Sequence, residues 1–377
     1  MSWITETAAL YDEIKEKVND SDEWEPILPL YHSTSNAQIQ VTIFSDGTFS
    51  HAEVVDADDA KTIIPVTEDS GSRGNGILPN PLCDKLIYIA GDYSTYVAKA
   101  KSDADEYFVT YIKALKAWAE SEYSDICITA IYDYLSKRML INDLIGDGIL
   151  KLKGAVLDEE YKITKSAKQI DSFVRFVVND LDSGENIKVW KSKALFDKYI
   201  AYYEALGKER DCQLCYASGK IVPVTYKHMA RIRNGGDKAK LISSNDKSNF
   251  TYRGRFANRE EAFAVGEIVS QKAHLALKWL IKTGGISVGD EKYVAWESCL
   301  NEIPNVFGRI ALDASENSGS FAKDKDDKVY AKTAEQYKNI IEMAIKGYKK
   351  NLDLNSSKVI LISFIPVSYT HLTLPTI

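Results

Sequence analysis

The chain has 377 residues, of which 45% are hydrophobic and 27% are charged, and its formal net charge at pH 7 is −7. This composition is that of a globular protein and excludes a fibrous or intrinsically disordered chain. No run reaches the roughly 18 apolar residues of a helical membrane span, so we expect no membrane partner. The first residues predict no secretory signal, and five cysteines without one predict reduced thiols and a cytoplasmic location.

Apolar residues at helical spacing predict an amphipathic helix near the start of the chain, and the residues after it predict three strands. The first strand alternates apolar and polar side chains, and Asp46-Gly47 after it is a typical hairpin turn. Pro65 indicates that the third strand lies near a sheet edge, because proline donates no backbone hydrogen bond. We expect the helix over 3–18 and the strands over 38–44, 48–55 and 61–68.

The middle of the chain predicts a loop followed by several helices. Residues 67–81 are rich in Ser, Gly, Asn and Pro and therefore predict the loop. Gly207 is well placed to end a helix, because glycine adopts the backbone conformation found after a helix C-terminus. We expect helices at about 82–98, 103–120, 125–140 and 190–206, and a strand at 173–178.

The clearest predicted helix begins near Asn258, which can cap it, with Glu261 in a capping-box position. Five apolar residues then share one helical face: Val265, Val269, Ala273, Ala276 and Leu280. Two strands and a lysine-rich helix complete the pattern, at 293–297, 358–365 and about 332–350. Hairpins and helices without regular βαβ alternation predict an α+β fold, with an N-terminal sheet and helices followed by a mixed region.

The charge is distributed very unevenly. Residues 1–70 contain 15 acidic side chains against 3 lysines, whereas residues 220–259 contain 10 basic side chains and only Asp237 and Asp246 as acids. We call residues 220–259 the basic island. Ordinary soluble surfaces intersperse the two signs, so this segregation indicates a function. The basic residues are Lys220, Lys227, Arg231, Arg233, Lys238, Lys240, Lys247, Arg253, Arg255 and Arg259.

The composition of the basic island predicts a loop-rich surface with one short strand at 239–244. Lysine and arginine neutralise phosphates and release counterions. Aromatic side chains, here Tyr226, Phe250, Tyr252 and Phe256, offer faces on which unpaired bases can stack. We therefore expect a nucleic-acid surface. The alternative is a solvated basic loop that forms salt bridges with the acidic N-terminal region.

The last residues, PVSYTHLTLPTI (366–377), resemble the translation of a sequencing adapter. We expect this segment to be non-native, and we exclude it from fold and function. We therefore expect the native chain to continue beyond residue 365. The expected division is an N-terminal α+β region over 1–165, a mixed region with the basic island over 166–365, and the non-native tail.

Catalytic and metal sites are poorly supported by the sequence. Cys212 and Cys215 form a CxxC pair and His228 follows 13 residues later, but a fourth zinc ligand is missing. Residues 324–335 resemble a calcium loop only at its ends, because Val329 stands where glycine is needed. The loop at 70–76 has no phosphate-binding lysine. We therefore predict no catalytic residue, no metal and no cofactor.

Three blocks, at residues 67–93, 212–245 and 259–281, carry a family likeness in their order and spacing. Together they resemble the large subunit of the subtype I-C (Dvulg-type, Csd family) CRISPR effector complex. The resemblance spans nearly all of the chain before the tail. Cys215 and Gly219 match the pattern of the second block, whereas Cys212 departs from it. The family also has a C-terminal helical bundle, which we expect this chain to lack.

The resemblance implies a binding protein and not an enzyme. Such a subunit sits beside the crRNA in an RNA-guided surveillance complex and recognises the protospacer-adjacent motif in double-stranded target DNA. It helps open the duplex, contacts the displaced strand and recruits a helicase-nuclease, while guide pairing supplies the sequence specificity. The implied partners are therefore other effector-complex subunits with crRNA, target DNA and the helicase-nuclease.

We expect two groups of DNA-binding residues. Within the loop and helix start at 67–85, glycine permits close approach to a groove and Asn can bond to base edges, so this segment is the candidate motif reader. A plain surface turn is the alternative for it. The basic island is the candidate surface for phosphates and the displaced strand. The residues are Arg73, Asn75, Asn80 and Lys85 in the first group, and Arg231, Arg233, Lys238, Lys240, Lys247, Arg253 and Arg255 in the second.

Two other functions remain open from the sequence. One is a metal- or thiol-dependent enzyme built on Cys212, Cys215 and His228. The other is a stand-alone nucleic-acid-binding protein outside any CRISPR complex.

Overall fold

The computed structural model describes residues 2–18, 26–71, 76–98, 100, 102–165, 167–207, 212–233, 237, 239–242, 256–258, 261, 264–288, 291–297 and 359–364. Helices and strands are mixed along these ranges, which confirms the predicted α+β class. The chain forms two compact units. The first is Leu28–Cys212, and the second combines Met1–Ile27 with Gln213–Ile377.

These units do not follow the division expected at residue 165. Strand β7 (Val174–Asn179) pairs with β2 (Ile39–Phe44), so the sheet of the first unit needs residues from both sides of that point. The expected division into an N-terminal α+β region over 1–165 and a mixed region over 166–365 stays a prediction. The segment 366–377 lies outside the described residues.

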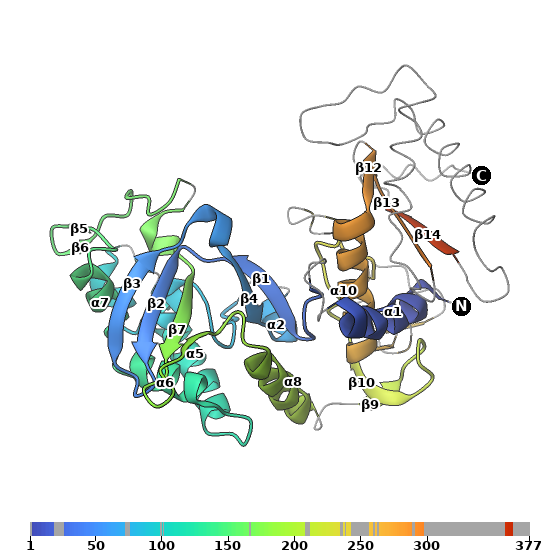
Figure 1. Ribbon diagram of the computed structural model, residues 1–377, viewed down its shortest axis with the longest axis horizontal. Coiled ribbons are helices and arrows are strands. Elements are labelled where there is room, and N and C mark those ends of the chain that lie inside the picture. The colour runs from blue at the N-terminus through green and yellow to red at the C-terminus, as the bar shows by residue number, and fades with distance from the viewer. Residues whose placement is uncertain are drawn as a thin grey trace, which may run out of the picture. The chain divides into compact units, whose positions relative to one another are not determined.

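A four-stranded mixed sheet organises the first unit (Figure 1). Its order is β3-β2-β7-β8, with β3 spanning Phe49–Val54 and β8 spanning Asn186–Lys188. β2 pairs antiparallel with β3 and parallel with β7, and β8 returns antiparallel to β7. The predicted β2–β3 hairpin is confirmed, because Gly47 adopts a positive φ of 76° between the two strands.

The third predicted strand forms as β4 (Lys61–Pro65), but outside this sheet. It pairs antiparallel with β1 (His32–Asn36), which the sequence pattern did not predict. The β1 sequence, HSTSN, has no apolar side chain, so an alternation search cannot detect it. Pro65 lies opposite His32 at the end of the pair, which agrees with the edge position expected for proline.

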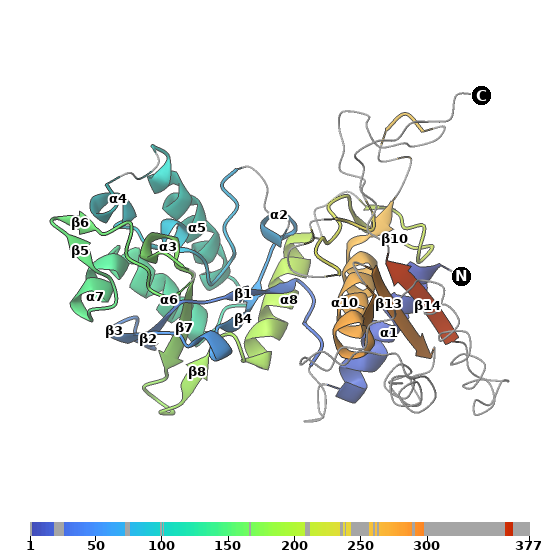
Figure 2. The same ribbon diagram turned by 90° about the horizontal axis from the view of Figure 1, so that it is seen from above.

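Helices α5 (Ala104–Ala119) and α6 (Ile126–Ser136) confirm two predictions and cover one face of the sheet (Figures 1 and 2). α6 contacts β2 and β7, and α5 packs on α6. The side chain of Asp125 caps α6 by accepting a hydrogen bond of 2.7 Å from the Cys127 N–H. α6 ends at Ser136, and a separate helix, α7 (Leu140–Gly146), follows.

The helix expected at 82–98 is instead two short helices, α3 (Leu86–Ile89) and α4 (Tyr93–Tyr96). Gly91 lies between them against Arg138, where an added Cβ would approach the Arg138 Cγ to 2.5 Å. The carboxylate of Asp92 then accepts hydrogen bonds from the N–H groups of Ile141 and Asn142 at the start of α7. These contacts with a later segment interrupt the helical run.

The first unit contains further short elements and one longer helix. α8 (Lys193–Gly207) confirms the helix expected at 190–206, and β7 confirms the strand expected at 173–178. The others are 3-10 helices η1 (Ala57–Asp59) and η2 (Gln169–Asp171), helix α2 (Glu68–Gly71), and the hairpin of β5 (Leu152–Lys153) with β6 (Val156–Leu157). One hydrophobic core joins apolar residues of the sheet, α5, α6 and α8.

Helix α10 (Glu267–Gly284) organises the second unit. It packs against α1 (Trp3–Val18), which confirms the predicted N-terminal helix, and contacts β13 (Glu291–Glu297). β13 and β14 (Val359–Phe364) confirm the two late strands and form a sheet in the order β12-β13-β14, with β12 at Ile286–Val288. The helix expected near 332–350 lies outside the described residues.

The helix predicted from Asn258 is divided. Glu261 donates its N–H to the Asn258 Oδ1 at 2.9 Å, so the capping-box contact exists. Val265 lies not in a helix but in strand β11 (Val265–Gly266), and α10 begins only after it. β11 pairs with β10 (Ile221–Thr225) in a sheet of order β11-β10-β9, where β9 is Cys212–Leu214. Tertiary pairing therefore overrides the local helical pattern here.

Candidate nucleic-acid interface

The structure describes only part of the loop expected to read a DNA motif. Arg73 and Asn75 lie outside the described residues. Asn80 is buried, and its N–H donates a hydrogen bond of 2.7 Å to the Asp84 carboxylate. Lys85 is exposed and directly precedes α3, and its own N–H bonds to the same carboxylate. Lys85 therefore presents its charge to solvent, whereas Asn80 lies within the protein.

The basic island is described at residues 220–233, 237, 239–242 and 256–258. The backbone of Ala230 forms an antiparallel bridge with Lys240, which is what the structure shows of the short strand expected there. This bridge brings the two halves of the island together, although Ala230 and Lys240 are ten positions apart in the sequence. Four candidate residues lie outside the described part: Lys238, Lys247, Arg253 and Arg255.

Three candidate cations of the basic island can be placed. Arg231 is exposed and adopts a positive φ of 59°, which is uncommon for a residue with a side chain. Arg233 forms an ion pair with Asp237, with 2.6 Å between Nε and Oδ2, and only 17% of its side chain is exposed. Lys240 is half-buried. Among the described candidates of the basic island, Arg231 is therefore the one whose charge is most available to a phosphate.

A buried polar cluster links the basic island to helix α10. The His228 Nδ1 lies 2.8 Å from the Ser270 hydroxyl, and its ring stacks on that of His274 at a centroid distance of 6.0 Å. The His274 Nδ1–H donates to the Ser270 carbonyl at 2.6 Å. Burial, followed by the neighbouring charges of His274 and Lys240, lowers the pKa of His228 to about 3. His228 is thus a neutral structural group at pH 7.

Cys215 organises the turn between β9 and β10. Its Sγ accepts hydrogen bonds from the N–H groups of Gly266 at 3.1 Å and Ser218 at 3.3 Å. Burial alone raises the pKa of this thiol, but the hydrogen bonds from Ser218 and Gly266 outweigh burial and hold the pKa below its ordinary value. Across the part of the chain that the structure places, no group of three His, Cys, Asp or Glu side chains is arranged to hold a metal ion. Cys215 and His228 instead belong to separate hydrogen-bond networks.

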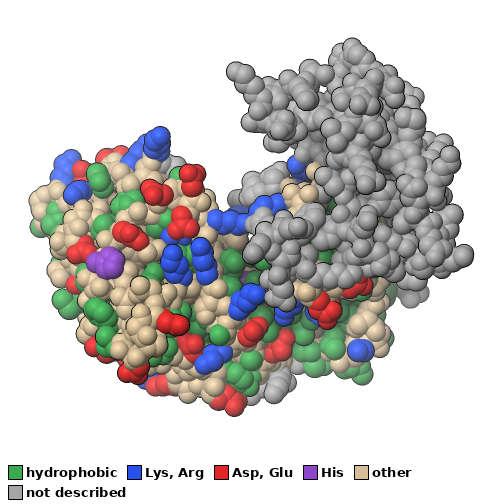
Figure 3. Space-filling model, in the orientation of Figure 1, with side chains coloured by type: hydrophobic (Ala, Val, Ile, Leu, Met, Phe, Trp, Pro, Cys, Tyr) green, Lys and Arg blue, Asp and Glu red, His purple; other side chains and the backbone are tan. Residues whose placement is uncertain are grey.

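The charged side chains of the first unit follow a different pattern from the island. Figure 3 shows Lys and Arg interspersed with Asp and Glu over the face of the Leu28–Cys212 unit that it displays. Such mixing is typical of a solvated surface with no polyanionic ligand.

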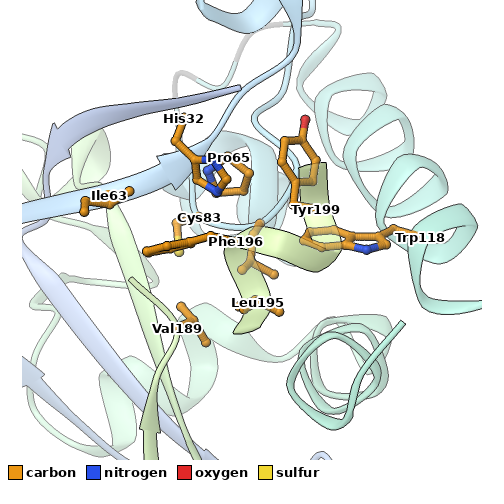
Figure 4. A pocket seen from close by; sticks show the side chains of 10 residues that line it. His32, Ile63, Pro65, Cys83, Trp118, Val189, Leu195, Phe196 and Tyr199 are labelled. Carbon is orange, nitrogen blue, oxygen red and sulfur yellow. The ribbon is translucent and has the colours of Figure 1, made fainter. Parts of the chain in front are cut away.

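A small pocket of the first unit combines a histidine with aromatic side chains (Figure 4). His32 points into it beside Phe196 and Tyr199, with ring centroids 4.8 and 5.5 Å away. Burial lowers the pKa of His32 to about 4, and its Nδ1–H donates to the Leu30 carbonyl at 2.7 Å. Burial raises the pKa of the Cys83 thiol on the pocket wall to about 12. Both groups are therefore neutral at pH 7, and the Cys83 sulfur is a thiol and not the more nucleophilic thiolate.

The fold and these residues define the class: an α+β protein whose second unit carries a basic segment and buried polar networks. No helix in the described ranges is long and apolar enough to cross a membrane. A family model described as CRISPR-associated protein (Cas_Csd1) matches residues 9–364. The chain therefore belongs to this family and is a CRISPR-associated protein of the Cascade-subunit kind. A comparison with curated proteins finds no match.

Sequence reasoning missed two features of this region. The Ser270–His274 contact has a sequence signal, because residues four apart share a helix face. The contact of His228 with the same cluster has no sequence signal, because His228 and Ser270 are 42 positions apart in the chain.

Proposed function

We propose that the chain is the large subunit of a subtype I-C CRISPR effector complex. In this role it acts in the cytoplasm, in antiviral defence, with crRNA and other subunits of the complex. It recognises the protospacer-adjacent motif, binds the target duplex and the displaced strand, and helps recruit the helicase-nuclease without catalysing a reaction itself. Family membership carries this proposal. The exposed Arg231, within an island of net charge +8, supports DNA as the ligand.

The chemistry of the described residues agrees with a binding role. The buried histidines are neutral, and Cys215 is engaged by backbone N–H groups that fix a turn.

The salt dependence of duplex binding tests the DNA surface. We expect Arg231→Ala to weaken binding to a short duplex and to reduce the slope of log affinity against log salt by about 0.9, because one phosphate contact is lost. Lys113→Ala is the matched control, since Lys113 is an exposed cation of α5 in the first unit. Fluorescence anisotropy over a salt series measures both variants. An equal slope for Arg231→Ala and the unchanged chain would remove Arg231 from the interface.

Assembly tests the complex itself. We expect the chain to co-purify with the other effector subunits only when crRNA is co-expressed, and to add duplex binding to that complex. A chain that binds DNA equally well alone and never enters the complex would instead be a stand-alone nucleic-acid-binding protein.

A further inference from the structure

The β9–β10 hairpin presents three large apolar side chains to solvent. Leu214 is 52% exposed, Tyr216 is 57% exposed and Ile221 is 75% exposed. We call these three residues the apolar tip. Single exposed apolar residues are common on soluble proteins, whereas exposed apolar residues gathered together are a feature of binding surfaces. Leu214 and Ile221 flank the turn that Cys215 and Lys220 close with a backbone hydrogen bond of 2.8 Å.

The turn that carries the apolar tip is held firmly from within. The Gly219 N–H donates to the Cys215 carbonyl at 2.8 Å, and Cys215 Sγ ties the turn to β11. Tyr216 is anchored at both ends, because its N–H bonds to the Ala264 carbonyl at 2.9 Å and its hydroxyl donates to the Glu261 carbonyl at 3.1 Å. A ring that is anchored yet largely exposed loses little conformational freedom when a ligand stacks on it.

The charge of the residues around the apolar tip indicates the class of ligand that the tip binds. Residues 212–236 contain no Asp or Glu, and they contain four cations: Lys220, Lys227, Arg231 and Arg233. Lys220 is exposed and is the immediate neighbour of Ile221. The nearest acidic residue in the contacts of the tip is Glu261, whose backbone carbonyl accepts the Tyr216 hydroxyl, and the tip's own segment carries only cations. An apolar and aromatic surface beside cations complements a chain of phosphates that carries exposed bases. In a duplex the base faces are stacked and hidden, so this surface suits an unpaired strand.

We propose that the apolar tip binds an unpaired DNA strand. Tyr216 stacks on a base, Leu214 and Ile221 contact neighbouring bases or sugars, and Lys220 contacts a phosphate. This inference rests on the proposed function, because it assigns a hairpin to the strand that a target duplex releases when it opens. It extends the nucleic-acid surface from the basic island to side chains that carry no charge.

The test compares two DNA probes on the full chain. The probes are a labelled oligothymidine of about 20 nucleotides and a blunt duplex of equal length, with binding measured by fluorescence anisotropy. We expect Tyr216→Ala to weaken single-strand binding about 5- to 160-fold, the range of one lost base-stacking contact, and to leave duplex binding within about twofold. Tyr216→Phe keeps the ring and should restore most of the affinity. Ile221→Ser should weaken single-strand binding by a smaller factor.

Leu181→Ala is the control, because Leu181 is a 59% exposed residue of the first unit. This substitution should change the affinity for neither probe. If the unchanged chain binds neither probe, the proposed function fails. If the unchanged chain binds both probes and Tyr216→Ala binds the single strand with the same affinity, the role of the apolar tip is refuted while the proposed function stands. An equal loss on both probes, or intact DNA binding with lost assembly into the effector complex, would show that the tip supports the fold or a protein contact and would overturn the inference.

Discussion

At the scale of single residues, the guanidinium of Arg175 shows how a charge is accommodated in the first unit. Only 2% of Arg175 is exposed. Its Nε donates to the Gln40 Oε1 at 3.0 Å, it forms an ion pair with Asp59, and it lies 3.8 Å above the centre of the Trp190 ring. The parallel register places Arg175 directly beside Gln40, so this network exists only because β2 and β7 are neighbours.

His32 yields a prediction about acid stability. Its pKa is about 4 in the folded chain, against about 6.5 when unfolded, because burial disfavours the charged ring. Between these pH values the unfolded state binds a proton that the folded state does not, so stability falls as pH falls from about 6.5 toward 4. The expected slope from this residue is at most about 1.4 kcal/mol per pH unit.

Urea unfolding of the full chain between pH 7 and pH 4 checks this. His32→Asn keeps a donor near the Leu30 carbonyl. It should reduce the slope of unfolding free energy against pH by the contribution expected from His32. The same substitution at His51, which is exposed, is the control. Identical pH dependence for His32→Asn and the unchanged chain would refute the assignment.

At the scale of elements, turns hold the first sheet in register. In the β2–β3 hairpin, the Asp46 carboxylate accepts the Thr48 N–H at 2.8 Å, and the Lys137 Nζ donates to the Gly47 carbonyl at 2.7 Å. The hairpin turn thereby packs on the end of α6. A Cβ on Gly47 would lie 2.8 Å from the Asp133 Cβ, so this turn requires glycine for both its positive φ and its close approach.

Gly47→Ala therefore combines two costs. We expect the free energy of unfolding to fall by about 3 kcal/mol. About 1–2 kcal/mol of this comes from the left-handed backbone at an alanine, and the remainder comes from the clash with Asp133. Gly148→Ala separates the two, because Gly148 has a φ of 74° with no atom near a built Cβ. Gly148→Ala should therefore lower the free energy of unfolding only by the part that comes from the left-handed backbone. Chemical denaturation measures both, and equal losses would show that the approach to Asp133 has no energetic consequence.

At the scale of the whole molecule, the second unit is discontinuous in sequence. Ile4 of α1 belongs to a core cluster with Val265 and Ala273, and Asp12 pairs with Lys272 at 2.7 Å. The N-terminal helix therefore covers the helix that supports the basic island, although more than 200 residues separate them.

This arrangement predicts which part of the chain an N-terminal substitution affects. Ile4→Ala should destabilise the second unit by about 2–4 kcal/mol, because a buried side chain is truncated. Hydrogen exchange should show faster exchange in α10 and unchanged protection in β2 and β7. Ile268→Ala, on a 40% exposed residue of α10, is the control. Loss of protection in β2 and β7 as well would show that the two units unfold together.

The sequence alone determined the types of most described elements, since helical and alternating periodicities are local properties. It also indicated the β2–β3 turn at Gly47, the segregated charge and the family likeness. Only the tertiary structure decided the β1–β4 pairing, the parallel β2–β7 register and the division of the helix expected from Asn258. It also decided the burial of His228 and the exposure of Ile221. These features depend on contacts between residues distant in the chain, which no local pattern encodes.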